Sequence, residues 1–205
     1  MNILAINTAS FSSQIALVNK EKILGEKKWK SENNESEMLM PEIQNLLSEN
    51  GLKFENIDKV VVITGPGPFT ALRVGIALAN AFVYGLSKPL VGISLNEYWR
   101  NAYKGDFVLN AGQNRVFHKG EIIDFETFLK SFDKSNDLSG ELKDDQIIKL
   151  EESGIKWVNS EKLPSFGKVI LDLAQKDFKG YDDKEFVEPL YFSAPQITKS
   201  TKSYK

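Results

Sequence analysis

Hydrophobic and polar residues in the first 103 positions follow two different periods. Apolar residues alternate with polar ones, or form β-branched runs, in several short segments, and both patterns are typical of strands. These segments predict strands at residues 3–6, 14–18, 23–29, 59–64 and 90–93. Apolar residues three and four positions apart predict helices at residues 37–49, 71–85 and 95–103. Ser36 is placed to cap the first of these helices. A strand, a glycine-rich turn and a helix in succession indicate an α/β fold.

The pattern weakens after residue 104. Strands are predicted at residues 107–110, 115–119 and 121–124, and a helix at 169–178. The stretch 130–145 is so polar and charged that we expect a loop or an irregular helix there. The chain therefore divides into an N-terminal half (1–103), a smaller degenerate second half (104–195) and a solvated tail (196–205).

Composition narrows the classes of function. The chain has 205 residues, a net charge of -2, one histidine and no cysteine. It therefore lacks the excess positive charge with which a protein captures a nucleic acid by itself. A histidine-pair or thiolate metal site is excluded, and we expect neither catalytic nor metal-binding residues. We expect no membrane span and no signal peptide, and hence a cytoplasmic protein.

The segment Gly65-Pro66-Gly67-Pro68-Phe69-Thr70 lies between a predicted strand and a predicted helix. Backbone N–H groups at the start of a helix attract anions, so Gly65, Gly67 and Thr70 are weak candidates for a phosphate loop. The lysine of a P-loop is missing from this motif. A tight strand-to-helix turn explains the two glycines at least as well.

The glycine-rich segment and its flanks resemble a known family. Residues 65–75 are similar to the signature G-P-G-S-F-T-G-x-R-I-G of the TsaB (YeaZ) family. Further similar segments lie in the family's order at residues 3–9, 36–43, 89–97, 109–117 and 188–195. The resemblance implies the actin-like, sugar-kinase and Hsp70 type of α/β fold (ASKHA), with two related halves, each with a mixed sheet, the second half being eroded.

The resemblance also implies a function. Family members are non-catalytic scaffold subunits that bind a TsaD-type enzyme in the complex that forms threonylcarbamoyladenosine in tRNA next to the anticodon. A TsaE-type ATPase also joins, tRNA is reached only through the complex, and a homodimer is an option for the chain alone. ATP is expected only at the partner or at the junction with it, so this chain carries no cofactor of its own.

Several positions depart from the family's pattern. ATP-using relatives have an aspartate after the first strand, whereas this chain has Asn7. An amide lacks the negative charge that a hard cation prefers. Asn110, Gly112 and Arg115 replace a family aspartate, arginine and glutamate. These replacements indicate the loss of an active site.

Two predicted helices are candidates for the contact with a partner. The helix at 71–85 has only a narrow polar stripe of Arg73, Asn80 and Tyr84, so one sheet face cannot hide its remaining apolar surface. Gly75 and Ala79, four residues apart, suit close packing either on another helix or on the sheet. The expected interface residues are Met38, Leu39, Ile43, Leu46, Arg73, Val74, Leu78 and Phe82. The alternative is that both helices simply pack on their own sheet.

Other functions remain open from the residues alone. One is an active ATP-dependent small-molecule kinase or ATPase of the same fold superfamily, and another is a homodimeric interaction module. A glycoprotease is disfavoured by the single histidine. His118 is expected to be an exposed residue at a strand end, and Ser10, Ser12 and Ser13 either contact phosphate or belong to an ordinary turn.

Overall fold

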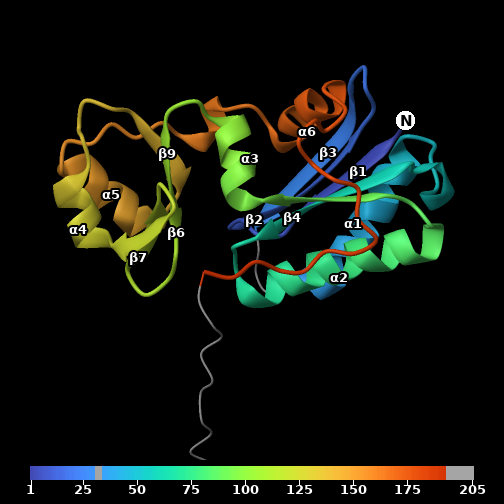
Figure 1. Cartoon of the computed structure of the whole chain (residues 1–205), viewed down its shortest axis with the longest axis horizontal. Coiled ribbons are helices and arrows are strands. Elements are labelled where there is room, and N and C mark those ends of the chain that lie inside the picture. The colour runs from blue at the N-terminus through green and yellow to red at the C-terminus, as the bar shows by residue number, and fades with distance from the viewer. Residues whose placement is uncertain (31–33, 193–205) are drawn as a thin grey trace, which may run out of the picture.

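The computed structural model describes residues 1–30 and 34–192, which fold into two sheets lying side by side (Figure 1). The first sheet has five strands in the order β3-β2-β1-β4-β5. Their bounds are β1 Ile3–Asn7, β2 Ser12–Val18, β3 Ile23–Lys30, β4 Lys59–Gly65 and β5 Leu90–Ser94. β1 is antiparallel to β2 and parallel to β4, so the sheet is mixed, as the sequence predicted.

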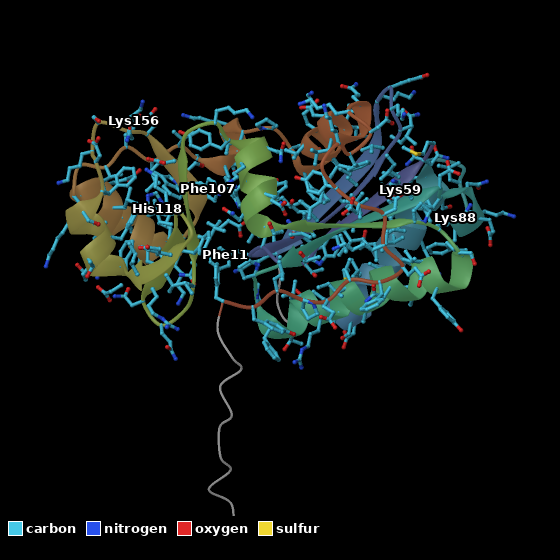
Figure 2. All side chains as sticks on the ribbon, viewed as in Figure 1. Phe11, Lys59, Lys88, Phe107, His118 and Lys156 are labelled. Atoms are coloured by element: carbon cyan, nitrogen blue, oxygen red, sulfur yellow. The ribbon has the colours of Figure 1, made fainter. Side chains whose placement is uncertain are left out.

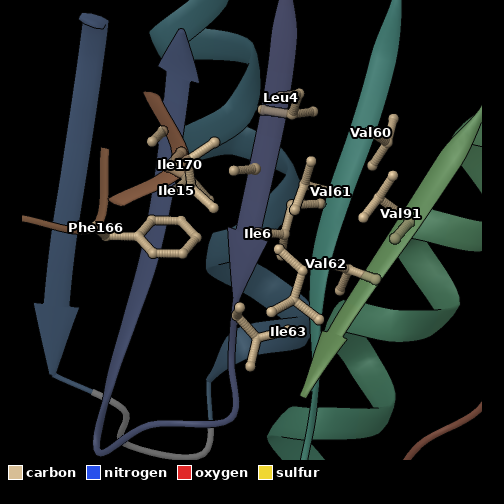
Figure 3. Packing of buried hydrophobic residues seen from close by; sticks show 14 of the residues in the cluster. Leu4, Ile6, Ile15, Val60, Val61, Val62, Ile63, Val91, Phe166 and Ile170 are labelled. Carbon is tan, nitrogen blue, oxygen red and sulfur yellow. The ribbon is translucent and has the colours of Figure 1, made fainter. Parts of the chain in front are cut away.

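Helices cover both faces of the first sheet. The crossover helices α1 (Glu35–Glu49) and α2 (Phe69–Leu86) lie on one face, and α6 (Phe166–Gln175) lies on the other (Figure 1). Because β4 is covered on both sides, a continuous β-branched run fits it better than an alternating pattern. Figure 3 shows Phe166 and Ile170 of α6 packed near Ile15 of β2.

The second sheet is smaller and has the strand order β8-β7-β6-β9. Its strands are β6 Asp106–Asn110, β7 Arg115–His118, β8 Glu121–Asp124 and β9 Leu138–Glu141. β6 is antiparallel to β7 and parallel to β9, which repeats the pairing of β1 with β2 and β4. The helices α4 (Phe125–Ser131) and α5 (Asp144–Glu152) close a separate core around Phe125 and Phe128. The two halves are therefore related, and the second has one strand fewer.

The helix α3 (Leu95–Ala102) is the last element before the second sheet, and the boundary at residue 103 stays a prediction. The second half differs from the prediction, because α6 and the residues after it return to the first sheet. In the stretch 130–145, where a loop or an irregular helix was expected, α4 ends at Ser131, β9 forms at Leu138–Glu141 and α5 begins at Asp144. The tail expected at 196–205 lies outside the described residues.

The start of α1 is a correction to the sequence analysis. The helix begins at Glu35 with Asn34 before it, so Ser36 lies inside the first turn and is not the cap. Pro41 lies within the helix. The helix exists where it was predicted, and only its first turn differs.

Helix α2 is long and apolar enough, by length and composition, to cross a membrane. It connects two parallel strands of one sheet and packs on that sheet through Leu72, Ile76 and Ala79. Crossing a membrane would require the removal of this helix from the core. We therefore treat α2 as a crossover helix of the first half.

Two glycines of α2 provide a matched test of this packing. A Cβ atom on Gly75 would lie 2.2 Å from Oγ1 of the buried Thr8, whereas a Cβ atom on Gly85 would meet nothing within 4 Å. Gly75→Ala is expected to lower the free energy of unfolding by about 2 kcal/mol, because the buried threonine has to shift. Gly85→Ala is expected to raise it by about 0.5 kcal/mol through helix propensity. Urea unfolding of both variants measures the difference, and equal effects would contradict the close contact between α2 and β1.

Candidate functional site

The apolar helix α2 has an outer face that the described part of the chain leaves uncovered. We define this face by its exposed residues Arg73, Ala77, Ala81, Tyr84 and Gly85. Tyr84 is 90% exposed, and only a third of the helix is buried. An 18-residue helix of this composition normally buries more of its length, so the outer face of α2 is suited to a second contact.

Small residues line this face at a spacing of four. Ala77, Ala81 and Gly85 are exposed, and they let the backbone of another helix approach closely. Gly75 and Ala79, for which the sequence left packing on another helix or on the sheet open, point inward and are buried against the first sheet. The structure therefore favours the second of these alternatives.

The expected interface residues divide between the core and the surface. Leu39, Ile43 and Leu46 of α1 are at most 2% exposed and belong to the core of the first half. This part of the expectation is corrected, because the apolar stripe of α1 is the side that faces its own sheet. The residues that retain some accessible surface are Met38, Arg73, Val74, Leu78 and Phe82. For these five, a role at an interface remains a prediction.

The polar stripe of α2 has an intramolecular explanation. An extended segment, residues 184–192, runs along α2, and we call it the C-terminal strap (Figure 1). The side chain of Asn80 donates to the carbonyl of Val187 and accepts from its N–H, both at 2.9 Å. Arg73 donates to the hydroxyl of Tyr191 at 2.8 Å. The C-terminal strap therefore fixes α2 from the side.

The glycine-rich loop is packed tightly against its own chain. A Cβ atom on Gly67 would lie 2.3 Å from the carbonyl oxygen of Ala9, and one on Gly65 would lie 2.6 Å from that of Leu190. Thr70 is exposed in the first turn of α2. These contacts favour a tight turn over a phosphate cradle, because the space beside each glycine is filled by backbone. A cavity of about 530 Å³ lies between this loop and residues 109–113 of the second half.

The turn after β1 contains a polar network at the junction of the two halves. Asn7 donates to the hydroxyl of Ser10 at 3.0 Å, and this hydroxyl donates to Glu141 at 2.7 Å. The indole of Trp99 on α3 donates to the same carboxylate at 3.1 Å. Phe11, labelled in Figure 2, lies between the halves, and its N–H donates to the second carboxylate oxygen of Glu141 at 3.3 Å. Asn7 and Ser10 were candidates from the sequence, whereas Glu141 was not.

Local sequence explains how α3 presents Trp99. Ser94 caps the helix by accepting from the N–H of Glu97, and the carboxylate of Glu97 accepts from the N–H of Ser94. This reciprocal capping box fixes the start of α3. Trp99 then lies one turn farther along the helix, at the edge of a second cavity of about 540 Å³.

The positions that depart from the family's pattern in the second half also have structural partners. Asn110 donates to Gln146 at 2.8 Å and accepts from the N–H of Gly112 at 3.0 Å. The backbone N–H of Arg115 donates to the carbonyl of Gly112 and closes the turn between β6 and β7. These groups therefore form a turn that positions the strands.

His118 is structural, and it is less exposed than expected. Its ring lies edge-on to Phe128 and Phe132, with centroid distances of 5.1 and 5.7 Å. Its Nδ1 lies 3.0 Å from the carbonyl oxygen of Phe107 (Figure 2). Within residues 1–30 and 34–192, no group of three or more histidine, aspartate or glutamate side chains is placed to hold a metal ion.

Comparisons with known protein sequences match less than half of the chain. The TsaD family model, described as tRNA N6-adenosine threonylcarbamoyltransferase, matches residues 24–117. The tRNA threonylcarbamoyladenosine biosynthesis protein TsaB of Bacillus subtilis is 32% identical over 94 residues, which cover 46% of this chain and 41% of that protein. TsaB of Escherichia coli is 30% identical over 94 residues, which cover 46% of this chain and 40% of that protein. The matched segments span less than half the length of these relatives.

Comparisons with solved structures extend over nearly the whole chain. YeaZ from Pseudomonas aeruginosa is similar with a TM-score of 0.65 and 17% identity, over 93% of this chain and 99% of that one. A crystal structure of an uncharacterized protein with similarity to peptidase YEAZ from Pseudomonas aeruginosa has a TM-score of 0.69 and 19% identity, with 94% and 99% covered. The similarity confirms the expected α/β fold of the ASKHA type.

Proposed function

The chain belongs to the TsaB/YeaZ family, and we propose that it is a non-catalytic scaffold subunit that binds a TsaD-type enzyme through the outer face of α2. That enzyme forms threonylcarbamoyladenosine in tRNA next to the anticodon. The single observation that carries the proposal is the exposure of α2, of which two thirds is not buried although the helix is almost entirely apolar.

The properties of this face fit a partner helix of like fold. Val74, Leu78 and Phe82 flank the small residues and are only partly buried, so they offer apolar area at the edge of the face. Phe82 already stacks on Phe54, with ring centroids 5.0 Å apart, and is held in place before a partner arrives. Side chains that are fixed in advance lose less entropy on binding.

The polar groups at the junction support a non-catalytic role. Asn7 stands where ATP-using relatives have an aspartate, and its amide is engaged with Ser10 and with the N–H of Ala9. Glu141 already receives three hydrogen bonds. Groups engaged in this way are poorly placed to act as a general base or to hold a magnesium ion. We therefore place any ATP at the partner or at the junction with it.

The remaining partners follow from the family. We propose that a TsaE-type ATPase joins the complex and that tRNA is reached only through the complex, because a net charge of -2 gives this chain no attraction for a polyanion. A cytoplasmic location follows from that role. Self-association through the same face in the absence of the enzyme is the second candidate, since an exposed apolar face favours a symmetric dimer.

Reconstitution tests the proposal. The purified chain and a TsaD-type enzyme from the same organism are expected to elute together as a heterodimer in size-exclusion chromatography with light scattering. Adding the chain is expected to raise the rate at which that enzyme modifies tRNA in the presence of the other components. Separate elution, or transfer at the same rate without the chain, would overturn the proposal. Magnesium-dependent ATP hydrolysis by the chain alone would instead favour the kinase or ATPase alternative.

A further inference from the structure

The carboxylate of Glu141 connects the second half to the first half. Glu141 ends β9, and all three of its hydrogen-bond donors lie in the first half. Two donors come from the turn after β1, namely the Ser10 hydroxyl and the Phe11 N–H. The third is the indole of Trp99 on α3. Hydrogen bonds to an ionised carboxylate are stronger than those between neutral groups.

The arrangement requires an amide at position 7. The Ser10 hydroxyl has a single hydrogen, which it donates to Glu141, so it needs a donor as its other partner. The side-chain N–H of Asn7 is that donor, and its orientation is fixed because its oxygen accepts from the N–H of Ala9 at 2.9 Å. Asn7 and Ser10 are both buried. An aspartate at this position would have no hydrogen to donate to Ser10 when ionised, and it would place a second negative charge near Glu141.

We propose that the carboxylate of Glu141 is a clasp that holds the two halves in one fixed arrangement. Asn7 positions the Ser10 hydroxyl so that it donates its hydrogen to this carboxylate. Asn7 then does more than replace an acidic residue, because the clasp requires an amide at this position. Glu141 and Phe11 also line both cavities and thus stand between them. A negative carboxylate at this point repels anions from the turn after β1. The inference does not depend on the identity of the partner.

The aromatic contacts between the halves share Trp99 with the clasp but do not involve Glu141. Trp99 stacks on Phe107 of β6 with centroids 6.2 Å apart, and Phe117 of β7 contacts Phe192 of the C-terminal strap at 5.1 Å. Contacts of this kind tolerate sliding, whereas three hydrogen bonds to one carboxylate fix its position. The clasp therefore determines the arrangement that the aromatic contacts support.

Burial raises the pKa of Glu141, while its hydrogen bonds and the charge of Lys28 on β3 act in the opposite direction. Tyr98 on α3 stays neutral, because burial and then Glu141 raise its own pKa. The other charged groups that line the two cavities are Glu26, Lys27, Asp144, Glu161 and Arg115. Because the pKa of Glu141 is raised, the folded chain binds its proton more tightly than the unfolded chain. Ionising Glu141 therefore costs the fold stability as the pH rises through the raised pKa, and the three hydrogen bonds of the clasp reduce that cost.

Hydrogen exchange tests the clasp directly, because the N–H of Phe11 is one of its donors. Glu141→Ala is expected to speed exchange at Phe11 at least about tenfold while exchange within β1 and β4 stays unchanged. Asn7→Asp is expected to have the same effect through Ser10. The control is Asp144→Ala, which removes an exposed carboxylate from the same cavity and is expected to leave Phe11 protected.

A second variant keeps the test informative if Glu141→Ala does not fold. Glu141→Gln retains the shape but turns an N–H₂ group toward the N–H of Phe11, so faster exchange at Phe11 is again expected. The free energy of unfolding of the native chain, relative to that of Glu141→Gln, is expected to fall as the pH rises above the ordinary pKa of glutamate. Native protection of Phe11 in both Glu141 variants, or in Glu141→Gln where only that one folds, would overturn the proposal.

Discussion

Ala81→Arg is expected to weaken the binding of a TsaD-type enzyme at least about 100-fold, or about 2.7 kcal/mol. Ala81 is exposed in the middle of the outer face of α2, between Ala77 and Gly85. An arginine at this position blocks the close approach of a second helix and places a charge where it would lose its hydration. Isothermal titration calorimetry with the purified enzyme measures the change in dissociation constant.

The control for this experiment is Gln175→Arg, which introduces the same side chain at an exposed position of α6 on the opposite face of the first sheet. It is expected to leave the dissociation constant unchanged. The midpoint temperature of unfolding of both variants is expected to equal that of the native chain, because neither position is buried. Equal affinity of the Ala81→Arg variant and the native chain would show that the partner does not bind at the outer face of α2.

The sequence was a good guide to the first half because local and tertiary preferences agree there. The β-branched run of β4 is buried on both sides, and Gly67 after it is required by the close approach of its backbone to Ala9 in the turn after β1. The predicted strands and helices of this half match the observed ones to within two residues at most ends. Where local and tertiary preferences agree in this way, secondary structure can be predicted from the sequence pattern.

The strands and helices of the second half were harder to predict from the sequence, because they depend on tertiary contacts. Strand β9 is four residues long and contains a serine, a glycine and a glutamate, so its local propensity is weak. It forms because it pairs with β6 in parallel. Missing this strand also meant missing Glu141, since a single glutamate in a charged stretch has no pattern that marks it as a contact between the two halves.

The candidate interface shows a different limit of sequence reasoning. An amphipathic stripe identifies which residues of a helix are apolar, but it does not tell which neighbour they face. Leu39, Ile43 and Leu46 lie on one apolar side of α1, and all three are buried in the core of the first half. Helix α2, in contrast, keeps apolar surface that is not buried within the chain.

A stability measurement can decide whether Gly67, the second glycine of the Gly65-Pro66-Gly67 segment, is required for packing within the chain. Gly67→Ala is expected to lower the free energy of unfolding by about 3 kcal/mol, because its Cβ atom would meet three backbone atoms of Ala9 within 2.8 Å. Backbone cannot move aside as a flexible side chain does, so the turn after β1 or the start of α2 has to shift. Urea unfolding followed by circular dichroism measures the loss.

The comparison is with Gly112→Ala, on the other side of the same cavity. Gly112 has a φ of +74° and open space around it, so alanine there costs only about 1 kcal/mol of backbone strain. A large loss at Gly67 and a small one at Gly112 would assign Gly67 to packing within the chain. If Gly67→Ala were as stable as the native chain, the glycine would not be needed for the fold. That result would support the phosphate-loop interpretation, because the binding of an anion to the backbone would be the remaining reason for a residue without a side chain at position 67.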